Sequence, residues 1–121
     1  MNRHSPMTQK LIMNQYRSLF RICRNEYDKP GLEIIRKAYN LMVEHSSDDH
    51  LVYGESSIIH STQLARMVVK ELEMDPITVA TALVLRCVLR KKVPVEDVKE
   101  TLGPRIASIL IDLLKISTVA T

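Results

Sequence analysis

The sequence has no tryptophan, one phenylalanine and only three glycines in 121 residues. Aromatic residues make up 4% of the chain against 45% hydrophobic residues overall, so any core must be built from aliphatic side chains. Three glycines are also too few for the frequent turns of a β-sandwich or barrel. Long segments rich in Leu, Ile, Val, Met and Ala therefore predict an all-α fold, a compact helical bundle.

Cysteines are equally few. Cys23 and Cys87 lie far apart, within apolar helical patterns and without CxxC spacing, which predicts two buried free thiols in a reducing compartment. No run approaches 18 apolar residues, and the N-terminus has no signal-like apolar region. We expect a cytoplasmic protein with no membrane partner. The net charge of +3 is mild and does not identify an anionic partner.

A chain of this length is expected to form one domain, residues 1–121, with residues 1–7 flexible. Asp75 and Pro76 give a strong helix start, and Thr8 is a candidate cap for the first helix. In the third segment Met67 and Leu72 are expected to point inward. The predicted helices are residues 8–24, 31–44, 60–72, 76–89, a short helix from Pro94 that Gly103 closes, and 104–116.

Apolar residues recur at three- and four-residue steps in these segments, which places them on single helix faces. The segment 77–89 is apolar on most sides and is therefore expected at the centre of the bundle. The expected inward residues of the other helices are Ile12, Tyr16, Leu19, Phe20 and Cys23; Ile35, Ala38, Tyr39 and Met42; Leu64 and Val68; and Ile106, Ile109, Leu110 and Leu113.

The order of these pieces matches a known pattern. An "AY" helix is followed by a polar loop ending in "GESSIIH", an "LA" helix, "DPITVATAL" and then "VEDVKETLG". From about Ile35 to Ile116 the chain resembles the N-terminal HD-type hydrolase domain of the RelA/SpoT family, which makes and degrades guanosine tetra- and pentaphosphate. The resemblance implies an HD-type bundle of about six helices that this chain ends before completing.

In active members of that family, a histidine, a His-Asp pair and a later Asp hold a divalent metal, usually manganese. A Glu-Asp pair one turn on positions the attacking water. When Gly103 is set against the family's glycine, His60 keeps the first ligand position. The resemblance then places Leu85 and Arg86 at the His-Asp pair, and Leu89 and Arg90 at the Glu-Asp pair. A guanidinium cannot ligate a metal, so we expect no catalytic residue, no bound metal and a vestigial His60.

Two further groups of residues resemble functional sites, a polar loop and a run of cations. The loop "HSSDDH", with His45, Asp48, Asp49 and His50, matches no common metal site. In the same loop, Leu51 and Val52 replace the family's nucleotide-binding Arg-Lys. The run "RKK" from Arg90 to Lys92 fits a solvated helix end better than an RNA contact, because no aromatic platform accompanies it.

Arg86 lies within an apolar helix, so it must pair with an acidic residue or reach solvent. Arg86 and Lys115 are candidate contacts for a guanine nucleotide.

The resemblance implies a regulatory pseudo-hydrolase domain at the N-terminus of a GTP pyrophosphokinase. Its expected partner is a synthetase domain further along the same protein, which would use magnesium, and nucleic acid is not expected. Two alternatives remain: an active metal-dependent HD phosphohydrolase of guanosine tetraphosphate, and a basic helical module that binds RNA or the ribosome.

Overall fold

The computed structural model describes residues 5–46 and 56–120, with side chains as far as Ile116. Every regular element within these ranges is a helix, and there are six, which confirms the predicted all-α class. They are α1 (Pro6–Glu26), α2 (Lys29–Ser46), α3 (Ser57–Lys70), α4 (Pro76–Leu89), α5 (Val95–Leu102) and α6 (Pro104–Ala120). No helix in these ranges is both long and apolar enough to cross a bilayer.

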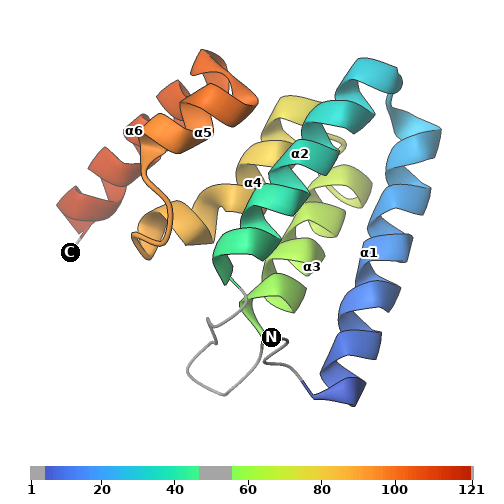
Figure 1. Cartoon of the computed structure of the whole chain (residues 1–121). Helices are drawn as coiled ribbons and strands as arrows, with labels where there is room; N and C mark the ends of the chain where they lie inside the picture. The colour runs from blue at the N-terminus through green and yellow to red at the C-terminus, as the bar shows by residue number, and fades with distance from the viewer. Residues whose placement is uncertain (1–4, 47–55, 121) are drawn as a thin grey trace.

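Helix α4 lies at the centre of the bundle, as its apolar sequence predicted. It packs against α2 and α3, and α6 contacts it from a third side. Helix α1 forms one edge of the molecule and packs mainly along α3, whereas α5 and α6 form the opposite edge (Figure 1). The fully buried side chains of the centre include Val79, Leu83 and Val84 of α4, Ile35 and Met42 of α2, and Ile106 and Leu110 of α6.

The helix starts follow local hydrogen bonding. Asp75 caps α4 by accepting bonds from the backbone N–H and the hydroxyl of Thr78 at 2.9 and 2.8 Å, and Pro76 takes the first helical position, as predicted. The first helix begins earlier than expected. Its cap is Ser5, whose Oγ accepts from the N–H of Thr8 at 3.1 Å, so the prediction that Thr8 caps the helix was wrong.

The third helix differs most from expectation. It begins at Ser57, three residues before the predicted start, with Ser56 as its cap, and it ends at Lys70. Met67 and Leu72 are 54% and 60% exposed, so their predicted inward position was wrong. The buried side of α3 instead uses small and polar residues beside its aliphatic ones: Ile58, Ser61, Thr62, Ala65, Val68 and Val69.

The C-terminal pair of helices is joined at Gly103. Its φ of 99° lies in the region that glycine adopts at little cost, and its N–H bonds to the carbonyl of Lys99 at 2.9 Å. Ile106 and Leu110 are buried as predicted, whereas Ile109 and Leu113 are half-buried at a groove described below. The sixth helix continues to Ala120, beyond its expected end.

Both cysteines are buried free thiols, as predicted. Burial raises the pKa of the Cys23 thiol to about 11. Cys87 Sγ lies 2.8 Å from the hydroxyl oxygen of Ser46, which links the last turn of α4 to the end of α2.

Candidate functional site

Arg86 connects the last turn of α4 to the start of α3. Its Nε donates a hydrogen bond to Ser57 Oγ, 2.9 Å away at the start of α3. Ser57 is fully buried and Arg86 is half-buried, so part of the arginine keeps contact with solvent. Arg86 was expected to pair with an acidic residue or to reach solvent; its partial exposure fits the second alternative, and one of its partners is the hydroxyl of Ser57. The guanidinium thus lies against the N-terminal turn of α3.

Ser57 is the residue that the sequence did not identify. The expected helix began at His60, which left Ser57 in the preceding loop and without a role. A signal was present, because Ser56 and Ser57 together are typical of a helix cap and its first turn. The side-chain oxygen of Ser56 accepts from the N–H of Ile58 at 3.2 Å, which starts the helix and orients Ser57 toward α4.

His60 lies one turn beyond Ser57 and is exposed. Its spacing places it on the same side of α3 as Leu64 and Val68, four and eight residues further on. Those two side chains face α4 and α6 across a groove, and His60 precedes them on the same side of α3. The resemblance assigns the first ligand position to His60.

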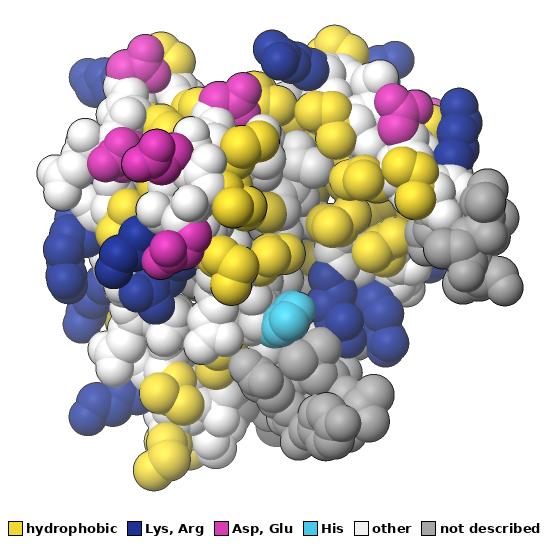
Figure 2. Space-filling view, turned by 180° about the vertical axis from the view of Figure 1, so that it is seen from behind, with side chains coloured by type: hydrophobic (Ala, Val, Ile, Leu, Met, Phe, Trp, Pro, Cys, Tyr) yellow, Lys and Arg dark blue, Asp and Glu magenta, His cyan; other side chains and the backbone are white. Residues whose placement is uncertain are grey.

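Leu85 faces this groove, which has a volume of about 260 Å³. We call it the α3–α4–α6 groove. Its lining is almost entirely apolar: Leu64, Val68, Thr78, Thr81, Ala82, Leu85, Ile109 and Leu113. Figure 2 shows a corresponding group of hydrophobic side chains on the face turned away from the viewer in Figure 1. Leu85 is therefore part of the apolar lining of the groove, and its side chain has no atom that could bind a metal.

Leu89 and Arg90 lie one turn further along α4 than Leu85 and Arg86, outside the core. Leu89 is 41% exposed and lines a separate hollow of about 340 Å³ with Lys91 and Leu114. Arg90 is the exposed C-cap residue, and its N–H bonds to the carbonyl of Arg86 at 2.9 Å. Lys115 is exposed on α6, and no contact described in the structure joins it to Arg86. The two candidate nucleotide contacts are therefore not brought together by a described interaction.

The "RKK" run forms the C-terminal cap of α4. The N–H groups of Lys91 and Lys92 bond to the carbonyls of Val88 and Cys87 at 3.0 and 2.8 Å, and Lys91 has a φ of 58°. This double bonding with a left-handed residue is the Schellman arrangement that satisfies the last carbonyls of a helix. Cations at this end also interact favourably with the helix dipole. Helix termination therefore accounts for these residues.

The ligands available in the described residues do not fit the metal of an active HD domain. Leu85 offers no donor, Arg86 offers only N–H groups, and His60 alone is too few for a metal site. No group of three or more His, Cys, Asp or Glu side chains within the described ranges is arranged to hold a metal. His45 is half-buried at the end of α2, whereas Asp48, Asp49, His50, Leu51 and Val52 lie outside the described residues.

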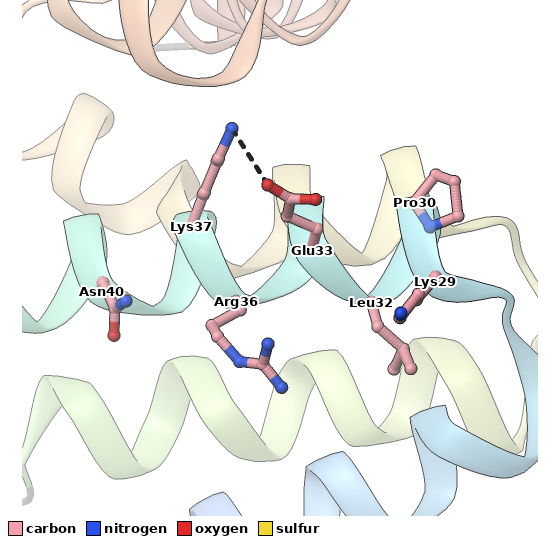
Figure 3. A pocket seen from close by; sticks show the side chains of 7 residues that line it. All are labelled: Lys29, Pro30, Leu32, Glu33, Arg36, Lys37 and Asn40. Carbon is pink, nitrogen blue, oxygen red and sulfur yellow. Dashed lines mark ion pairs between the residues drawn. The ribbon is translucent and has the colours of Figure 1, made fainter.

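A hollow of about 780 Å³ lies along α2, away from Arg86 and Ser57. All of its lining residues come from this one helix. In Figure 3, Glu33 and Lys37 point to one side of α2 and form an ion pair at 3.7 Å, while Leu32 and Arg36 point to the other. The Arg36 guanidinium is 5.8 Å from the centre of the Phe20 ring, which engages it in the packing of α1. Side chains that diverge in this way do not form a site around one ligand.

The bundle of six helices in the described residues is consistent with an HD-type domain. A family model described as HD domain matches residues 38–121, which is more than half of the chain. The chain belongs to this family. No curated protein and no solved structure matches it.

Proposed function

We propose that this chain is a non-catalytic HD domain of the RelA/SpoT type and the regulatory part of a GTP pyrophosphokinase. The proposal is supported by the resemblance from about Ile35 to Ile116 and by the agreement of the helices with its order of motifs. The parent enzyme would transfer pyrophosphate from ATP to the 3′ hydroxyl of GTP or GDP in a separate synthetase domain. This domain would bias the synthetase between active and inactive states through contact with it.

The observation that carries the proposal is the position of Arg86. Its guanidinium bridges α3 and α4 through Ser57, where the His-Asp pair of an active relative would begin the metal site. A fixed positive charge at this point opposes a divalent cation by Coulomb repulsion. Leu85 removes the other ligand of the pair and extends the α3–α4–α6 groove. The same two replacements that remove metal binding therefore stabilise contact between the two helices.

Manganese binding and guanosine tetraphosphate hydrolysis test the loss of activity. We expect no saturable Mn²⁺ binding by calorimetry and no release of pyrophosphate from guanosine tetraphosphate. Stoichiometric Mn²⁺ binding together with pyrophosphate release would show that the chain is an active phosphohydrolase with an unfamiliar ligand set. Both assays use the wild-type chain, so the result does not depend on whether a variant folds.

A ligand-restoring variant tests the position of the lost site. Leu85→His with Arg86→Asp would add an imidazole and a carboxylate beside the turn that carries His60, which gives three donors. We expect it to bind Mn²⁺ at least about tenfold more tightly than wild type, and His60→Ala to reverse the gain. Leu89→His with Arg90→Asp is the matched control, because it adds the same groups one turn further on. Equal gains in the two variants would contradict the assigned register.

The coding sequence beyond codon 121 tests the link to a synthetase. We expect it to encode a second domain with acidic magnesium-binding and basic phosphate-binding residues. A stop codon at that point would contradict the proposed parent enzyme and leave a separate pseudo-hydrolase domain.

A further inference from the structure

The outward face of α1 carries a row of cations, which we call the α1 basic stripe: Lys10, Arg17, Arg21 and Arg24. With Asn14 between the first two, these residues are spaced by four, three, four and three positions. Such spacing places all of them on one face of a helix. All four side chains are exposed, and the stripe lies opposite the buried face formed by Leu19, Phe20 and Cys23.

The stripe accounts for the whole net charge of the chain. Of the 17 Lys and Arg residues, four lie on α1, and of the 14 Asp and Glu residues, only Glu26 does. The rest of the chain therefore carries 13 of each and is balanced. The net charge of +3 is concentrated on α1, at the edge of the molecule (Figure 1). Figure 2 shows Lys and Arg side chains along the corresponding edge.

The fold does not neutralise this charge. Within the described residues, none of the four cations forms an ion pair. Arg21 lies four residues after Arg17 and three before Arg24, and like charges at these spacings repel by about 0.2–0.5 kcal/mol per pair. Neither helix packing nor ion pairing accounts for the row.

We propose that the α1 basic stripe binds the phosphate backbone of single-stranded RNA. From Lys10 to Arg24 the stripe spans 14 helical steps, or about 21 Å of helix, so its charges form a line like the repeating charges of a nucleic acid strand. Three of the four are arginines, whose planar guanidinium groups bind phosphate through paired hydrogen bonds. No aromatic residue lies in the stripe, so binding would be to the backbone and independent of base sequence.

The other anionic partners fit this surface less well. A helix that binds membranes inserts a continuous apolar face, but the apolar face of α1 with Leu19, Phe20 and Cys23 is buried in the core of the protein. The exposed large apolar side chains of α1 are Met7, Leu11 and Met13, all near its start. From Arg17 to Arg24 the exposed face has no such side chain, so this part of the stripe lacks the apolar anchors at the centre of a protein interface.

Our expectation that nucleic acid is not a partner rested on Arg90 to Lys92, three adjacent cations without an aromatic platform whose place helix capping explains. The stripe also lacks such a platform, so the proposal rests on its line of exposed charges alone.

The test is the salt dependence of binding to a labelled 20-nucleotide single-stranded RNA, measured by fluorescence anisotropy. The stripe variant carries Lys10→Gln, Arg17→Gln, Arg21→Gln and Arg24→Gln. The matched control carries Lys29→Gln, Lys37→Gln, Lys99→Gln and Arg105→Gln, which are four exposed cations elsewhere on the surface. Both variants lose the same net charge, so a difference between them reports where the charge lies.

We expect wild type and control to bind RNA with affinities that fall steeply with salt. The stripe variant is expected to bind at least about tenfold more weakly at 50 mM salt. Its slope of log affinity against log salt should be smaller by about three, since each phosphate contact contributes about 0.7. Circular dichroism and the thermal midpoint of each variant check folding, and relief of repulsion predicts an unchanged or higher midpoint for the stripe variant.

Three results would overturn the proposal: no RNA binding by wild type at 50 mM salt, equal loss in the control, or binding to phosphatidylserine vesicles without binding to RNA. None of these bears on metal binding at Arg86. The test is therefore independent of the proposed pseudo-hydrolase function.

Discussion

Arg86 shows how one side chain can have two effects. It places a positive charge in the last turn of α4, and its hydrogen bond to Ser57 ties that turn to the first turn of α3. A hydrogen bond that involves a charged group contributes about 1.5–3 kcal/mol when well formed, and less where solvent reaches it. Arg86 therefore has a structural function that does not depend on any ligand.

Burial in the fold lowers the reactivity of both cysteine thiols. The thiolate is the reactive form of cysteine, and burial raises the pKa of Cys23 to about 11. Cys87 is 2% exposed and lies against Ser46. We expect neither thiol to react with Ellman's reagent at pH 7.5 in the native protein, and both to react in 6 M guanidinium chloride. Rapid reaction of one equivalent in the native state would show that α4 or α1 opens readily.

Among the helices, α4 has the best-defined start. The backbone N–H and the hydroxyl of Thr78 both donate to Asp75, and these bonds lower the pKa of its carboxyl below the ordinary value of 3.8. A lowered folded-state pKa means that the carboxylate stabilises the fold above pH 3.8 and that this contribution is lost as pH falls through the lower folded value. The cap is therefore fully effective at neutral pH.

Asp75→Ala tests this cap. We expect the free energy of unfolding, from urea denaturation at pH 7, to fall by about 1 kcal/mol. The difference from wild type should shrink as the pH is lowered below 3.8. Asp112→Ala on the exposed face of α6 is the control, and its effect should stay within about 0.5 kcal/mol. A loss at Asp75 that does not change with pH would contradict a role for the charged carboxyl.

Sequence patterns predicted the helices well where chemical signals were strong. Asp75 and Pro76 correctly predicted the start of α4, because a helix cap requires particular residue types. Gly103 correctly predicted the junction of α5 and α6, because a residue with positive φ is most often glycine. The buried face of α3 was misread because Ser61, Thr62 and Ala65 occupy it, and a search for large apolar residues passes over them. The contact between Arg86 and Ser57 joins two helices distant in sequence, and helical periodicity carries no information about such pairs.

Two turns meet at one end of the whole molecule and hold the N-terminal helices against the centre. The Tyr27 hydroxyl, between α1 and α2, donates to the carbonyl of Met74, between α3 and α4. Close by, a Cβ added to Gly31 would lie 2.8 Å from Cγ of Pro76 and 3.2 Å from Asp28 Oδ1. Glycine at position 31 therefore allows the starts of α2 and α4 to touch.

Gly31→Ala tests this contact. The added methyl group must separate the two helix starts, so we expect the free energy of unfolding to fall by about 1–3 kcal/mol. Pro76→Ala removes the ring carbon that the methyl group would meet. The double variant is therefore expected to lose less than the two single variants combined, as measured by a thermodynamic cycle. Strictly additive losses would contradict direct contact between these positions.

The packing of α1 along α3 also sets an order of events during synthesis. Helix α1 packs mainly against α3, which is synthesised only after α2 and residues 47–56 are complete. Until then the apolar face with Leu19, Phe20 and Cys23 has only part of its final surroundings, through aromatic contacts with Tyr39 of α2. Contacts between segments distant in sequence form late because they must close a long loop. A nascent chain that stops before Ser57 would therefore expose this face and depend on chaperones for its solubility.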